Sequence, residues 1–184
     1  MEKKSIHSWK LLGSKTVFDR RWYRVRRDRV KIAPGKIIND YFLGVFPDIV
    51  LVVALTKDGK IPLVRQYKHG AGKILLEVPA GYIDKYETPL HAAKRELTEE
   101  TGYGAGTWKQ LGFFYSNPTK EKGNGLYIFF AKGVTQVAKA KMDETEAIDV
   151  FLVRRDTVIK KMLKNEIKVA GSMLALLLAL VGKK

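Results

Sequence analysis

One segment near the middle of the chain, residues 81–103, gathers three carboxylates on a single helical turn. At about 100° per residue, Glu96, Glu99 and Glu100 lie on one arc of the expected helix. Like charges at this spacing repel each other and weaken a helix. The arrangement is explained if a hard divalent cation such as Mg²⁺ binds there, because such a cation takes oxygen ligands and holds substrate phosphates. The alternative is a solvated helix face with an ordinary Arg95–Glu99 pair.

Local signals fix the ends of this helix. Thr88 is a suitable N-cap, with Pro89 at the first helical position, and Gly102 is placed to end the helix in a left-handed cap. Glu100 lies at the edge of an apolar stripe that we expect to face the core. The stripe consists of Leu90, Ala93 and Leu97.

The spacing within the segment is specific. Gly81 is followed by five residues, a glutamate, seven residues and then Arg-Glu-aliphatic-x-Glu-Glu-x-Gly. The segment therefore resembles the Nudix box. It differs only at Tyr103, a hydrophobic residue where the family more often has an aliphatic one. The resemblance implies an α/β (α+β) fold, a Nudix α/β/α sandwich with a mixed sheet plus an N-terminal antiparallel β element. We expect residues 1–45 to form that element and residues 46–184 the catalytic domain.

The resemblance also implies chemical roles. Nudix enzymes cleave nucleoside diphosphates linked to another group, using Mg²⁺ or, in some members, Mn²⁺. The implied metal ligands are oxygen donors, namely Glu96, Glu99, Glu100, the carbonyl of Ala80 and, outside the box, Glu146. The implied catalytic residues are Glu100, Glu144 as general base, and Glu87 with Arg95 as the pair that orients the ligands.

Motifs outside the box narrow the class. Residues 64–67 and 76–81 resemble the branch that hydrolyses ADP-ribose and other nucleoside diphosphate sugars, and residues 143–148 resemble its acidic substrate loop. A polar turn between strands is the alternative for that loop. The expected substrate-binding residues are Arg65, Lys68, Gly81, Pro118 and Arg27. The chain departs from the pattern of this branch at two positions. Thr119 follows Pro118, where glycine is common. Lys68 stands where relatives commonly have an arginine, and a lysine cannot make the bidentate contact of a guanidinium.

The formal net charge of +15 favours the binding of anions. Three explanations of this charge remain open: a nucleic-acid partner, a small pyrophosphate substrate, or a general basic composition without a specific partner. Rival functions are a Nudix hydrolase of capped RNA, dinucleoside polyphosphates or NADH, and a non-catalytic nucleic-acid-binding Nudix domain. Nucleic acid is not favoured as the partner, because such binding domains typically lose box carboxylates and this chain keeps every one.

Remaining features concern partners and location. In this branch the N-terminal β region forms a homodimer and completes the partner's nucleotide pocket, so we expect residues 20–29 to take part. The apolar run from Val169 to Val181 is too short to span a membrane. The chain has no cysteine, which is compatible with a reducing cytoplasm, where we expect it to act. His91 is interpreted as a helix-surface or packing residue.

The expected strands outside the box helix follow from hydrophobic patterning. The N-terminal part predicts one run over residues 15–32, a turn at 34–35 and a return strand over 37–46. Further strands are expected over residues 49–55, 61–67, 74–78, 107–114, 126–131 and 148–153. Two helices follow, one capped by Asp156 and one near the C-terminus. Strands and helices do not alternate regularly, which argues against a doubly wound parallel sheet.

Overall fold

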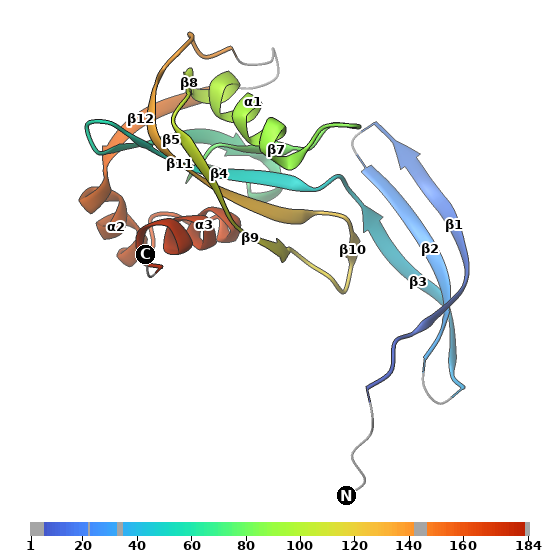
Figure 1. Cartoon of the computed structure of the whole chain (residues 1–184). Coiled ribbons are helices and arrows are strands. Elements are labelled where there is room, and N and C mark those ends of the chain that lie inside the picture. The colour runs from blue at the N-terminus through green and yellow to red at the C-terminus, as the bar shows by residue number, and fades with distance from the viewer. Residues whose placement is uncertain (1–5, 22, 33–34, 142–146, 183–184) are drawn as a thin grey trace, which may run out of the picture. The chain divides into compact units, whose positions relative to one another are not determined.

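The computed structural model describes residues 6–21, 23–32, 35–141 and 147–182 (Figure 1). The chain forms two units. The first comprises Met1–Pro47 and Tyr115–Asn124, and the second comprises Asp48–Phe114 and Gly125–Lys184.

The first unit is built on one four-stranded sheet in the order β1-β2-β3-β10. Its strands are β1 (Lys10–Arg20), β2 (Tyr23–Lys31), β3 (Ile37–Val45) and β10 (Glu121–Lys122). β1, β2 and β3 pair in antiparallel fashion, whereas the short β10 runs parallel to β3. Every residue of β1 is exposed in the single chain.

The predicted continuous run over residues 15–32 is wrong, because the chain turns back between Arg20 and Tyr23 and forms two paired strands. Asp19 accepts a hydrogen bond from Arg24 Nε at 3.1 Å across this turn. The arginines at the turn are not turn-forming residues, so alternation of polar and apolar side chains concealed the reversal.

The second unit contains two further sheets and the helices. One sheet has the order β7-β4-β11-β8 with β9 beside β11, and the other has the order β12-β5-β6. The strands are β4 (Ile49–Thr56), β5 (Lys60–Lys68), β6 (Lys73–Glu77), β7 (Ala80–Tyr82), β8 (Tyr103–Gly104), β9 (Thr107–Tyr115, its last residue in the first unit), β11 (Gly125–Gln136) and β12 (Ile148–Arg154). The helices are η1 (His69–Ala71), α1 (Pro89–Thr101), α2 (Arg155–Leu163) and α3 (Ala170–Leu180).

Strand β4 lies at the centre and separates two cores. It pairs in parallel with β11 and antiparallel with β7. Because side chains alternate along a strand, Leu51 and Val53 face the core that contains α3, and Val50 and Val52 face the core that contains α1. Helices α1 and α3 therefore cover opposite faces of a mixed sheet (Figure 1). This confirms the expected α/β/α sandwich.

Helix α1 has the predicted ends. The Thr88 hydroxyl accepts a hydrogen bond from the His91 N–H at 3.3 Å, Pro89 opens the helix, and Gly102 takes φ 75° in the left-handed region. The predicted stripe is wrong at Leu90, which is 40% exposed. The buried face is rotated toward Ala92 and includes Glu100 itself, so the sheet covers a different arc of the helix.

Helices α2 and α3 complete the second unit. Arg154, rather than Asp156, is the N-cap residue of α2, and its side chain makes no capping hydrogen bond, so the predicted Asp156 cap is wrong. Asp156 lies in the first turn, where its negative charge interacts favourably with the helix dipole and stabilises the helix. No helix within the described residues is long and apolar enough to span a membrane.

Candidate active site

The box residues meet where the short strand β7 leads into the loop before α1. Ala80 donates its backbone N–H to Glu100 Oε2 at 3.1 Å, which fixes the buried carboxylate against the strand. Gly81 pairs with Val50 on β4 and has no side chain, so the Glu96 carboxylate lies directly over its backbone. The loop and the helix are therefore locked together by the carboxylates that the sequence singled out.

Arg95 joins three of these carboxylates. Its Nε and Nη2 donate to the two oxygens of Glu87 at 3.1 and 2.9 Å, a bidentate arrangement. Its Nη1 donates to Glu96 Oε1 at 2.7 Å and to Glu99 Oε2 at 3.1 Å. Nη2 also donates to the carbonyl of Tyr82 at 2.9 Å, which ties the guanidinium to the end of β7.

The electrostatic consequence is clearest at Glu87. Hydrogen bonds from Arg95, followed by one from His91, lower the pKa of the Glu87 carboxyl from 4.5 to about 2, against the opposing effect of burial. The same contacts with Glu87, and then with Glu96, raise the pKa of the Arg95 guanidinium above its ordinary value. Both members of the pair therefore stay charged across the physiological pH range. His91 is exposed, and its Nδ1 lies 3.0 Å from Glu87 Oε1.

This pair predicts an acid-sensitive contribution to stability. The folded-state pKa of Glu87 is lower than its unfolded value, so its contribution is fully present above pH 4.5 and lost as the pH falls toward 2. The free energy of unfolding, measured by urea titration between pH 6 and about 2, should fall less steeply in Glu87→Gln than in the wild type. Parallel curves for the two proteins would contradict the assignment.

Gly81 gives a second prediction. A methyl group at this position would overlap the Glu96 carboxylate, which is the mobile end of a side chain. Gly81→Ala should therefore displace Glu96 while the fold is retained. For the nucleoside diphosphate sugar substrate expected from the sequence, kcat/KM should fall by about tenfold or more. Gly70→Ala is the matched control, because a methyl group there meets no atom within 4 Å. Equal activity of the two variants, measured with thermal melts alongside, would refute the role given to Gly81.

The donor chemistry of this site fits a hard divalent cation. Glu96, Glu99 and Glu100 offer carboxylate oxygens only, which Mg²⁺ and Mn²⁺ prefer. Over residues 6–21, 23–32, 35–141 and 147–182, no three acidic, histidine or cysteine side chains converge as a ready metal cluster. Instead Glu96 and Glu99 both face Arg95, while Glu100 faces the Ala80 N–H.

Two predicted substrate residues lie on β5 with partners of their own. Arg65 donates to Asp149 on β12 at 2.8 Å and lies 4.8 Å from the ring centroid of Phe151. Lys68 Nζ is 3.4 Å from Glu77 Oε1, an ion-pair distance without hydrogen-bond geometry. Both cations are therefore held by neighbouring strands of the sheet β12-β5-β6.

Glu77 is the residue that the sequence reasoning missed. It is 5% exposed, and its Oε1 has no hydrogen-bond partner in the described part of the chain. Burial raises the pKa of this carboxyl, against the opposing effect of Lys68. The available signal was a glutamate between the apolar residues Leu76 and Val78, since isolated buried carboxylates are costly.

The remaining predicted residues are not brought to the box by any described contact. Arg27 is an exposed residue of β2, and Pro118 lies in the turn before β10, so both belong to the first unit. Glu144 and Glu146 lie outside the described residues.

Comparisons with known proteins cover both units. Residues 45–176 match the NUDIX domain, and residues 9–43 match the nucleoside diphosphate sugar hydrolase N-terminal domain. The chain is 32% identical over 142 residues to an ADP-ribose pyrophosphatase of Mycobacterium tuberculosis, covering 77% of this chain and 68% of that protein. It is 33% identical over 122 residues to an ADP-ribose pyrophosphatase of Bacillus subtilis, covering 66% of this chain and 65% of that protein.

A solved structure shares the fold. The crystal structure of an ADP compounds hydrolase superposes with a TM-score of 0.82, covering 96% of this chain and 94% of that chain, at 24% sequence identity. At this identity the likeness concerns the fold.

Proposed function

The chain belongs to the Nudix hydrolase family, and we propose that it hydrolyses the pyrophosphate bond of nucleoside diphosphate sugars such as ADP-ribose. The products are a nucleoside monophosphate and a sugar phosphate, which for ADP-ribose are AMP and ribose 5-phosphate. The observation that carries the proposal is the intact set of box carboxylates, held by Arg95 and by the Ala80 N–H. The match of the N-terminal region to a nucleoside diphosphate sugar hydrolase domain supports the substrate class.

Nudix hydrolases generally require a divalent metal, and we propose Mg²⁺, with Mn²⁺ as a substitute. Its ligands would be Glu96, Glu99, Glu100, the Ala80 carbonyl and Glu146. When bound, the cation neutralises charge on the diphosphate and lowers the pKa of an attacking water. The Ala80 N–H holds Glu100 in place at 3.1 Å. Arg95 holds Glu96 and Glu99 on one side of the helix and is itself held by Glu87.

Residues outside the box complete the proposed mechanism. Glu144 would act as general base toward the attacking water. Arg65 and Lys68 would bind the substrate phosphates, which requires each cation to share its charge with Asp149 or Glu77. Pro118 and Arg27 would take part in substrate binding.

A substrate panel tests the proposal. Purified protein with Mg²⁺ would be given ADP-ribose, ADP-glucose, GDP-mannose, NADH, a dinucleoside polyphosphate and capped RNA, and the products would be identified by mass. Preferred release of a nucleoside monophosphate and a sugar phosphate supports the assignment. Cleavage of capped RNA alone would replace it with the rival hydrolase function, and failure to turn over any substrate would favour a binding domain.

We propose further that a second copy of this chain covers β1. Several large apolar side chains on and beside this strand are exposed in the single chain, namely Trp9, Leu11, Val17 and Phe18. Removing exposed apolar side chains from water favours association. Sedimentation equilibrium should give a homodimer that Phe18→Lys weakens, and a monomeric wild type at micromolar concentration would contradict it.

The absence of cysteine accords with action in the cytoplasm.

A further inference from the structure

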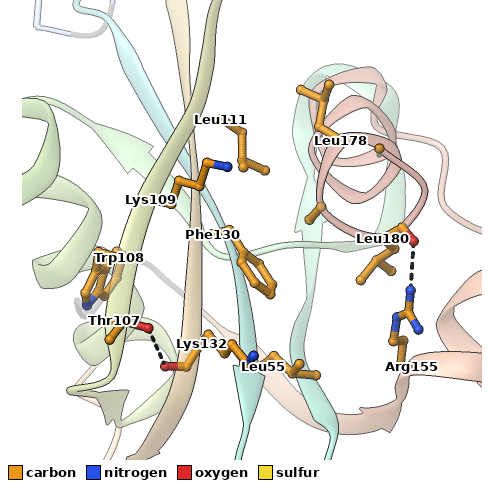
Figure 2. A pocket seen from close by; sticks show the side chains of 12 residues that line it. Leu55, Thr107, Trp108, Lys109, Leu111, Phe130, Lys132, Arg155, Leu178 and Leu180 are labelled. Atoms are coloured by element: carbon orange, nitrogen blue, oxygen red, sulfur yellow. Dashed lines mark hydrogen bonds between the residues drawn. The ribbon is translucent and has the colours of Figure 1, made fainter. Parts of the chain in front are cut away.

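A cavity lies within the second unit, on the side of the sheet that faces α3. Its volume is about 640 Å³, and residues of β4, β9, β11, α2 and α3 line it (Figure 2). Leu111, Phe130 and Leu178 in its wall belong to the core that contains α3, whereas α1 packs in the core on the other face. This part of the wall is therefore separated from the box carboxylates by the central sheet, whereas Trp108, which also lines the cavity, packs against the core that contains α1.

The walls of the cavity carry apolar side chains that remain partly exposed to solvent. Leu111 and Phe130 extend from the strands, and Leu178 and Leu180 extend from α3 on the opposite side (Figure 2). Leu55, Leu111 and Phe130 are each only partly buried, although they lie beside the main core. An apolar ligand would remove this surface from water, which is favourable in proportion to the area covered. The volume lies in the range of small-molecule sites.

Three cations border the same cavity. Lys109 is on β9, Lys132 on β11 and Arg155 at the start of α2. Among the described residues, none that lines the cavity is acidic, and no carboxylate forms an ion pair with any of these cations. Arg155 Nη2 donates to the carbonyl of Leu180 at 2.8 Å, which holds the guanidinium beside the end of α3.

The described residues of the lining offer few uncharged polar side chains. Among them only Thr107 carries a hydroxyl group, and its Oγ1 already donates to the Lys132 carbonyl at 3.5 Å. The Trp108 Nε1 donates to the carbonyl of Ala105 at 3.0 Å and is likewise occupied. A base or a ribose needs several directional hydrogen bonds, so this lining does not suit a nucleotide.

We propose that this cavity binds a single-chain amphiphile with an anionic head, of the class of medium-chain acyl carboxylates. The acyl chain lies between Phe130 and Leu178, and the head group lies among Lys109, Lys132 and Arg155. The site is independent of the proposed pyrophosphatase reaction, because the residues proposed to hold the acyl chain, Phe130 and Leu178, are in the core on the other face of the sheet.

Isothermal titration calorimetry with decanoate, below its micelle concentration, tests the proposal. One decanoate should bind per chain. Hexanoate and decanol should each bind about tenfold or more weakly, since the first loses apolar contact and the second loses the charge. Decyl phosphate distinguishes the head groups: binding comparable to decanoate supports an anionic site, and equal binding of decanol overturns it.

Two variants locate the binding. Lys109→Glu with Lys132→Glu should weaken decanoate binding by about tenfold or more, whereas Lys73→Glu, an exposed lysine outside the cavity, should leave it unchanged. Leu111→Trp keeps the charges and fills the cavity, so it should abolish binding. Circular dichroism checks folding in each case. Absence of decanoate binding to the wild type, more than one equivalent site, or unchanged binding in Leu111→Trp would overturn the proposal.

Discussion

Glu100→Gln is expected to lower kcat/KM for ADP-ribose by about two to three orders of magnitude while the protein stays folded. The glutamine amide has the shape of the carboxylate, and its oxygen can still accept the Ala80 N–H. What it lacks is the negative charge that a divalent cation requires. Removing one of three neighbouring like charges should leave the melting temperature unchanged or raise it. Steady-state kinetics and thermal melts measure the two effects.

Glu166→Gln provides the control for this experiment. The chemical change is the same, but Glu166 pairs with Lys161 on α2, far along the chain from the box. The control should retain wild-type turnover. If Glu100→Gln also retains wild-type turnover, the proposal that Glu100 binds a catalytic metal is contradicted. If the melting temperature collapses in that variant instead, Glu100 serves the fold rather than the reaction.

Arg95→Met is expected to destabilise the protein by about 2–3 kcal/mol, because it leaves carboxylates uncompensated in a poorly solvated position. The side chains of Glu87 and Glu96 are only 9% and 14% exposed. Activity should fall as well, by about 10–100-fold, since these carboxylates lose the group that orients them. Denaturant unfolding and kinetics at saturating metal measure the two losses.

A double-mutant cycle separates the pair from its surroundings. Glu87→Gln combined with Arg95→Met should recover part of the stability lost in Arg95→Met, because the buried charge that lost its partner is gone. Arg154→Met is the control, since Arg154 is 80% exposed and pairs with Asp156 at 3.6 Å. It should change stability by less than about 1 kcal/mol. Strict additivity in the cycle would show that Glu87 and Arg95 do not depend on each other.

The ends of the box helix were predictable because their causes are local. A threonine hydroxyl, a proline ring and a glycine in the left-handed region act within a few residues, and Thr88, Pro89 and Gly102 occupy the positions expected of them. The buried arc of the helix was less predictable. Which of Leu90 and Ala92 faces inward depends on how α1 lies against β4 and β11, and that is a tertiary property.

The network around the box was only partly visible in the sequence. The pairing of Arg95 with Glu99 follows from helical spacing, but its bidentate contact with Glu87 depends on the path of the loop. The Lys68–Glu77 pair arises because β5 and β6 are adjacent strands. The cavity beside α3 is assembled from five elements spread along the chain, so no sequence window contains its pattern.

The parallel pairing of β4 with β11 has a consequence for synthesis of the chain. The Gly125 N–H and the Asp48 carboxylate, which meet where these strands begin, are 77 positions apart. Contacts of such long range slow folding, because the intervening loop must close before any of them form. A nascent chain that ends before Gly125 already contains every box residue, yet it lacks the strand whose Phe129 and Ala131 complete the core beneath α1. We therefore expect that a ribosome must release most of the polypeptide before this helix docks.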